Sequence, residues 1–76
     1  MASTFDFTVV LEPQAEGGFS VSVPALPEVA TEGGTEAEAL DMAADAIRLV
    51  LEYRRQNGIP IPEDAIPTVR KITVAA

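Results

Sequence analysis

The stretch GGFSVSVPALPEVATEGGTEAEAL, residues 17–40, contains the transitions that decide the fold. Its alternating run FSVSV is typical of a half-buried strand, and two prolines interrupt that run before a second glycine pair. The segment Thr35-Glu36-Ala37-Glu38 then has the pattern of a capping box. In this box the Thr35 hydroxyl accepts a hydrogen bond from the Glu38 amide, and the Glu38 carboxylate accepts one from the Thr35 amide. The stretch therefore predicts a strand, a turn and the start of a helix.

A single helix is predicted from Glu36 to Gln56. Acidic residues occupy its first turns and arginines its last, as the helix dipole favours, and Asn57-Gly58 supplies a left-handed stop. Apolar side chains recur at three- and four-residue steps and indicate one buried stripe. We expect the stripe to pack on one face of a sheet through Leu40, Ile47 and Leu51.

Three strands are predicted before the helix. Residues 4–12 alternate between apolar and polar side chains until Pro13, and the glycine-bearing residues 14–18 are typical of a hairpin connection. The second strand covers residues 19–23. A short third strand is predicted over residues 28–32, where it is closed by the glycine pair that precedes the helix.

A last strand is predicted over residues 68–74, after the proline-extended segment Ile59-Pro60-Ile61-Pro62. In this strand Ile72 and Val74 share one face with Arg70, so one side of the strand is expected to be wet. The predicted order is β-β-β-α-β. The expected fold class is α+β, with one helix packed on an antiparallel-rich sheet in a single domain that spans residues 1–76.

The size of the chain favours self-association. A chain of 76 residues buries only roughly 60% of its unfolded surface. Because it contains no cysteine, neither a disulfide nor a thiolate metal site adds stability. We therefore expect a homo-oligomer, formed through an edge strand or through the sheet face that the helix leaves free.

Charge and hydropathy restrict the location and the partners. The chain has neither a basic, apolar leader nor a run of roughly 18 apolar residues, so we expect a cytoplasmic protein that has no contact with membranes. Twelve acidic and five basic residues give a net charge of −7, which repels phosphate backbones and attracts cationic partners. Direct binding of nucleic acid is not expected.

A nuclease would need several carboxylates around metal ions, and the sequence does not provide them. Asp6 lies inside a predicted strand with Glu12 at its end on the same face, whereas the helical acids lie on or near the polar side. The chain contains no histidine and no cysteine. We therefore expect no catalytic residue, no cofactor and no metal site, and hence no enzyme.

The corner Pro24-Ala25-Leu26-Pro27 has two interpretations. Two prolines hold Leu26 with little entropy left to lose on binding, as a recognition loop requires. Alternatively, Leu26 plugs the end of the core beneath the helix, which is the commoner fate of a loop leucine bounded by turn residues. If the corner does bind a partner, the predicted contact residues are Pro24, Leu26, Pro27 and Glu28.

The order of these segments resembles that of the HicB-like antitoxins of bacterial toxin-antitoxin pairs. The resemblance rests on the strand FTVVLEP, the corner EGG, the strand FSVSVPALP, the T-x-G-x-T-x-x-EA-L pattern of residues 31–40 and the IPIP segment after the helix. These segments cover residues 7–62 in the family's order. The family often has Gly-Cys after the Leu-Pro, where this chain has Glu28-Val29.

The resemblance implies a partial ribonuclease-H-like fold that binds and masks HicA, a small basic toxin that cleaves messenger RNA. A net charge of −7 agrees with such a partner. Full-length members carry a further DNA-binding segment after this domain. Because this chain stops at Ala76, we expect no C-terminal DNA-binding module and no self-regulation through DNA.

Two alternatives to an antitoxin remain open. One is a freestanding oligomeric binding or scaffold module of the same fold that has no toxin partner. The other is a degenerate nuclease. A neighbouring gene for a small basic protein with a catalytic histidine would favour the antitoxin over the freestanding module.

Overall fold

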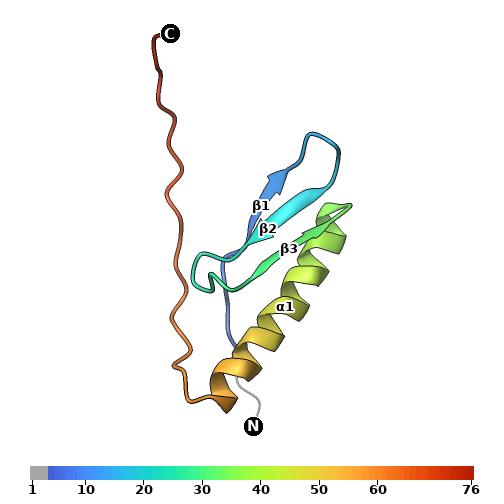
Figure 1. The fold of residues 1–76 in the computed structure, drawn as a ribbon, viewed down its shortest axis with the longest axis vertical. Coiled ribbons are helices and arrows are strands. Elements are labelled where there is room, and N and C mark those ends of the chain that lie inside the picture. The colour runs from blue at the N-terminus through green and yellow to red at the C-terminus, as the bar shows by residue number, and fades with distance from the viewer. Residues whose placement is uncertain (1–3) are drawn as a thin grey trace.

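The computed structural model describes residues 4–76 and contains three strands followed by one helix (Figure 1). The elements are β1 (Val10–Pro13), β2 (Phe19–Ser22), β3 (Ala30–Gly33) and α1 (Glu36–Gln56). The predicted α+β class, with three antiparallel strands followed by one helix, is confirmed. The α1 bounds agree with the prediction at both ends. Among residues 4–76, no helix combines the length and the apolar character that crossing a membrane demands.

The sheet has the order β1-β2-β3, with both pairs antiparallel. In the register Val10 lies opposite Ser22 on β2, so β1 begins later than the predicted Thr4. The next residues on the β2 side are Val23 and Pro24, where the chain turns, and proline has no amide to continue a ladder. Residues 4–9 are consequently left without a β2 partner.

The helix begins with the predicted cap, although one contact differs. The Thr35 Oγ1 accepts a hydrogen bond from the Glu38 amide at 3.1 Å, as expected for an N-cap. The Glu38 carboxylate accepts its hydrogen bond from the Gly34 amide at 3.0 Å, whereas the sequence predicted the Thr35 amide. The carboxylate therefore reaches back one residue further and satisfies an amide outside the helix.

The core lies between one face of the sheet and α1, in two adjoining clusters. Val21, Ala39 and Ala43 are buried together, and half-buried Val9, Leu11 and Phe19 pack against them. The second cluster consists of Val23, Leu26 and Val29, which half-buried side chains of α1 cover, among them Ile47 and Leu51.

The packing predicted for Ile47 and Leu51 is confirmed, and that predicted for Leu40 is wrong. Leu40 is 44% exposed, and its neighbour Ala39 is fully buried in its place. At its first turns α1 approaches the backbone of Gly33 so closely that only small side chains fit between them. The buried stripe of α1 is therefore rotated by one residue at that end.

The predicted last strand is absent from the chain as the structure shows it. Residues 68–74 are extended but pair with no strand, and they run away from the sheet (Figure 1). The chain before them is tied to the body at two points. Pro60 O accepts a hydrogen bond from Arg54 Nη1 at 3.0 Å, and the Asp64 carboxylate accepts two from Thr8, from its amide at 2.8 Å and from its hydroxyl at 2.7 Å.

Candidate partner-binding site

The proline corner is part of the core. The Leu26 amide donates to Val23 O at 2.9 Å and the Val29 amide donates to Leu26 O at 3.0 Å, so two successive turns carry the chain from β2 to β3. The Leu26 side chain has no exposed surface, whereas Pro24 and Pro27 are exposed. Of the two interpretations of Leu26, the plug at the end of the core is therefore confirmed.

Glu28, next to this corner, is fixed by an ion pair with α1. Arg54 donates to both carboxylate oxygens of Glu28, from Nε at 2.8 Å and from Nη2 at 2.9 Å. These hydrogen bonds from Arg54 lower the pKa of the Glu28 carboxyl, and the same bonds raise the pKa of Arg54. The two charges largely compensate each other, so the corner offers a partner the surfaces of Pro24 and Pro27 and little net charge.

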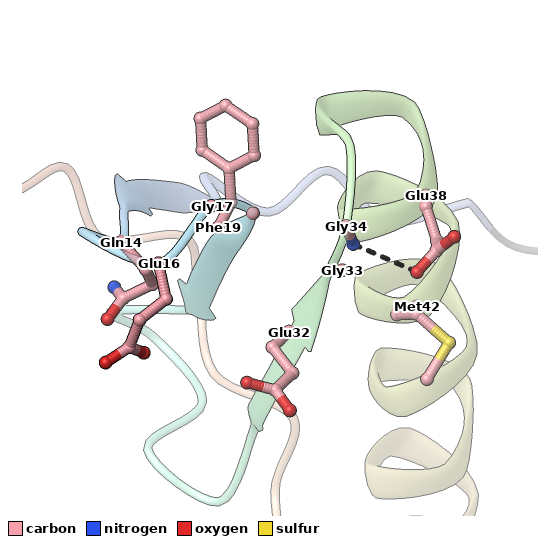
Figure 2. Close-up of a pocket in the computed structure, with 10 residues that line it drawn as sticks. Gln14, Glu16, Gly17, Phe19, Glu32, Gly33, Gly34, Glu38 and Met42 are labelled. Carbon is pink, nitrogen blue, oxygen red and sulfur yellow. Dashed lines mark hydrogen bonds between the residues drawn. The ribbon is translucent and has the colours of Figure 1, made fainter.

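A second candidate surface lies at the opposite end of the sheet, where the β1–β2 hairpin, β3 and the start of α1 meet (Figure 2). We call it the acidic groove. It has a volume of about 690 Å³. Its lining comprises Gln14, Glu16, Gly17, Gly18, Phe19, Glu32, Gly33, Gly34, Glu38 and Met42.

Two glycines bring the walls of the acidic groove together. Gly17 and Gly18 have φ angles of 100° and 79°, which L-amino acids with side chains rarely adopt, and this conformation closes the hairpin that carries Glu16. A Cβ atom on Gly18 would come within 2.7 Å of Gly33 O. The hairpin therefore approaches the end of β3 more closely than any side chain at residue 18 would allow.

Three carboxylates face solvent around this groove. Figure 2 shows Glu16 and Glu32 extending from the hairpin and β3, with Glu38 and Met42 on α1 beyond them. None of the three makes an ion pair with another side chain of residues 4–76. Met42 is 44% exposed and Phe19 is half-buried, so the lining also contains accessible apolar surface. Such a surface fits a cationic protein that has some apolar area.

The sequence did not predict this groove, because its lining comes from four separate segments that only the folded chain brings together. The closest signal in the sequence was the pair of double glycines, interpreted only as turns. Within the part of the chain that the structure describes, no three side chains among His, Cys, Asp and Glu lie close enough together to hold a metal ion.

Comparison with known proteins gives the family. No protein-family model matches the chain. An antitoxin HicB of Photorhabdus laumondii is 45% identical over 56 residues, and the antitoxin HicB of Escherichia coli is 38% identical over 58 residues. A UPF0150 protein of Thermoplasma acidophilum is 37% identical over 70 residues, which are 92% of this chain and 97% of that protein. The chain belongs to the HicB-like, or UPF0150, family.

The resemblance seen in the sequence is thereby confirmed. This HicB-like chain spans only 36% of the Photorhabdus antitoxin and 42% of the Escherichia antitoxin, although each match covers 74% of the chain itself. It has nearly the full length of the Thermoplasma UPF0150 protein. HicB-like proteins therefore contain this fold both as a portion of longer antitoxins and as almost the whole of a small protein.

Proposed function

We propose that this HicB-like chain acts as an antitoxin, which binds a small basic, HicA-type mRNA-cleaving toxin and covers its RNA-binding surface without any catalysis of its own. Relatives named antitoxin HicB support the antitoxin class. The structural observation that carries the proposal is the acidic groove, whose lining combines three carboxylates without an ion-pair partner in residues 4–76 with the exposed side chain of Met42.

The acidic groove suits such a partner for a simple physical reason. A protein that cuts RNA presents lysine or arginine side chains to the phosphates. Glu16, Glu32 and Glu38 offer carboxylate oxygens to those same cations, with charge-assisted hydrogen bonds in place of the phosphate contacts. Met42 adapts its shape to an apolar surface at the centre of the contact and excludes water there. The toxin is inhibited because its RNA site is covered.

The proline corner is proposed as a second contact. Pro24 and Pro27 are exposed and rigid, so they lose little entropy when a partner covers them. In this proposal Leu26 and Glu28 act indirectly, since one is buried and the other is paired with Arg54. Together they fix the shape of the corner.

The first step of the test is to ask whether a small basic protein is encoded next to this gene, and such a protein is the candidate toxin. Co-expression of the chain should restore growth to cells that the toxin arrests. In surface plasmon resonance, the double variant Glu16→Gln, Glu32→Gln should associate more slowly with the toxin. Glu38 is left unchanged because its carboxylate accepts the hydrogen bond from the Gly34 amide, just before α1.

The matched control is the double variant Glu52→Gln, Glu63→Gln. It removes the same number of charges by the same change of side chain, at two exposed positions that do not line the acidic groove. It should therefore slow association less than the groove variant does. Equal slowing by the two double variants would mean that only the net charge matters, and it would remove the acidic groove from the proposal.

An unchanged association rate for the double variant Glu16→Gln, Glu32→Gln would also remove the acidic groove from the proposal. Failure of the unmodified chain to bind the toxin or to restore growth would remove the antitoxin function itself. We place this encounter in the cytoplasm, where messenger RNA is cleaved, and propose no direct contact between this chain and nucleic acid, because its net charge of −7 repels phosphate.

The alternative is a freestanding oligomeric binding or scaffold module with no toxin partner. The UPF0150 protein of Thermoplasma acidophilum favours it, because that relative is almost the same length as this chain. A folded, self-associating chain that neither binds the neighbouring basic protein nor rescues growth would support this alternative. In both cases we propose that the chain forms homo-oligomers, since so small a domain buries little surface alone.

A further inference from the structure

The end of the chain is an extended, apolar segment that pairs with no strand among residues 4–76. We call residues 65–76 the C-terminal arm; Figure 1 shows it running alone, away from the sheet and the helix. Its large apolar side chains are 77–86% exposed, namely Ile66, Val69, Ile72 and Val74. An isolated extended segment has no internal hydrogen bonds to hold it, and exposed aliphatic side chains of this number favour burial. The C-terminal arm therefore has the properties of a strand that lacks its sheet.

The body of the molecule has an edge that lacks a strand. β1 is an outer strand of the sheet, and residues 4–9 before it pair with no strand. Beside this edge lies a groove of about 560 Å³ between the N-terminal segment and α1. Its lining comprises Thr4, Phe5, Asp6, Phe7, Ala44, Ile47, Arg48 and Leu51. A strand added at the β1 edge would place the side chains of one face next to this apolar groove.

The C-terminal arm and the rest of the chain have net charges of opposite sign. The C-terminal arm contains Arg70 and Lys71 and no acid. Residues 1–64 contain three basic and twelve acidic side chains, a net charge of −9. Ile66, Arg70, Ile72 and Val74 share one face of an extended strand, and Asp6 in the groove offers Arg70 an opposite charge. The groove also contains Arg48, which pairs with Asp45 on α1. The arm therefore matches the groove in apolar character and the body of the chain in the sign of its net charge.

The route of the chain directs the arm away from its own body. The contacts of Pro60 with Arg54 and of Asp64 with Thr8 fix the chain just before the arm begins. Pro62 and Pro67 stiffen the connection in an extended form. From there twelve extended residues reach up to about 40 Å, enough to cross a second molecule.

We propose that the C-terminal arm of one copy adds as a strand to the β1 edge of a second copy, and that the second copy returns its own arm in the same way. The result is a two-fold symmetric dimer with exchanged strands. This inference rests on the self-association proposed above and is independent of toxin binding. It supplies the fourth strand that the sequence predicts over residues 68–74.

The first test compares two neighbouring positions of the arm that lie on opposite faces. Size-exclusion chromatography with light scattering should give twice the chain mass for the unmodified protein at tens of micromolar. Ile72→Asp should raise the dimer dissociation constant roughly 100-fold or more, because each dimer buries this side chain twice. Thr73→Asp is the control, which adds the same charge on the other face and should leave the dimer intact. Equal effects of the two variants would contradict the proposal.

The second test distinguishes exchange from docking of the arm onto its own body. The chain has no cysteine, so the double variant Glu12→Cys, Thr73→Cys carries only the two introduced thiols, one in β1 and one in the arm. A flexible bismaleimide should join two chains, giving twice the chain mass on a denaturing gel. A link confined to one chain would show that the arm folds back, which overturns the exchange. A dimer in which no link forms between chains would support self-association but would contradict the role of the arm. A monomer would contradict both self-association and the exchange of arms.

Discussion

The backbone of Gly33 lies directly against Ala39, so that a Cβ atom at residue 33 would come within 2.6 Å of the Ala39 Cα. This contact joins the end of β3 to the first turns of α1 and buries both residues. The φ angle of Gly33 lies outside the positive region. The glycine is therefore required by the close approach of two backbones, and the small side chains of Ala39 and Ala43 follow from the same approach.

Gly33→Ala should destabilise the protein by about 1–3 kcal/mol, because the added methyl group forces α1 away from the sheet. Urea denaturation followed by circular dichroism gives the change in the free energy of unfolding. Gly34→Ala is the matched control, since a Cβ there meets nothing closer than Glu38 Oε1 at 3.8 Å. It should change stability by less than about 0.5 kcal/mol. Similar losses of stability for the two variants would mean that the close approach of Gly33 to Ala39 does not determine the stability of the fold.

Leu26→Ala should cost about 2–5 kcal/mol, as expected for a leucine with no exposed surface. Chemical denaturation measures it, and Leu49→Ala, at a position 68% exposed on α1, is the control with the same change in side chain. A loss for Leu26→Ala as small as that of the control would place Leu26 on the surface and restore it as a candidate recognition residue.

Stability should fall in acid as two bonded carboxylates become protonated. Hydrogen bonds from Arg54 lower the pKa of Glu28 below its ordinary 4.5, and hydrogen bonds from Thr8 lower that of Asp64 below its ordinary 3.8. Because both are lowered in the folded state, their contribution is complete above the ordinary values and disappears as the pH falls through the lowered ones.

The measurement is the urea midpoint over a pH series for the unmodified chain and for the double variant Glu28→Gln, Asp64→Asn. The difference between the two proteins should be constant near neutral pH and should shrink in acid. Glu63→Gln is the control, because it removes a nearby carboxylate that bonds neither to Arg54 nor to Thr8. A difference that does not change with pH would refute the assignment of these two groups.

Binding of the toxin should depend on salt mainly through its association rate. Exposed charges are screened beyond a Debye length of about 8 Å at physiological ionic strength, so the attraction that steers the encounter weakens as salt is added. Surface plasmon resonance over a salt series should show a steep fall in the association rate and a much smaller change in the dissociation rate. An association rate that is independent of salt would argue against steering by the acidic surface.

The helix and its caps were predictable because their signals are local. Thr35 and Asn57 mark the two ends of α1 through contacts within a few residues, and such contacts depend little on the rest of the fold. The bounds of β1 were not predictable in this way. They depend on where Pro24 turns the neighbouring strand away, which alternation within residues 4–12 does not reveal.

The candidate site was predicted only in part. The proline corner was recognised, and its packing interpretation is confirmed for Leu26. The pairing of Glu28 with Arg54 joins residues 26 positions apart, and the acidic groove joins a hairpin to a helix, so neither follows from spacing. The contact residues proposed for a partner stay a prediction. So does the partial ribonuclease-H-like character of the fold.

The order β1-β2-β3 has a consequence for how the chain folds. Each pair in the sheet joins strands that follow one another in sequence, and α1 then packs on β3 and β2. Nearby contacts close small loops, which favours rapid folding of each chain. An exchange of arms requires two chains to meet and is therefore second order. Refolding should then show a fast phase that is independent of concentration, followed by a slower phase whose rate rises with the concentration of protein.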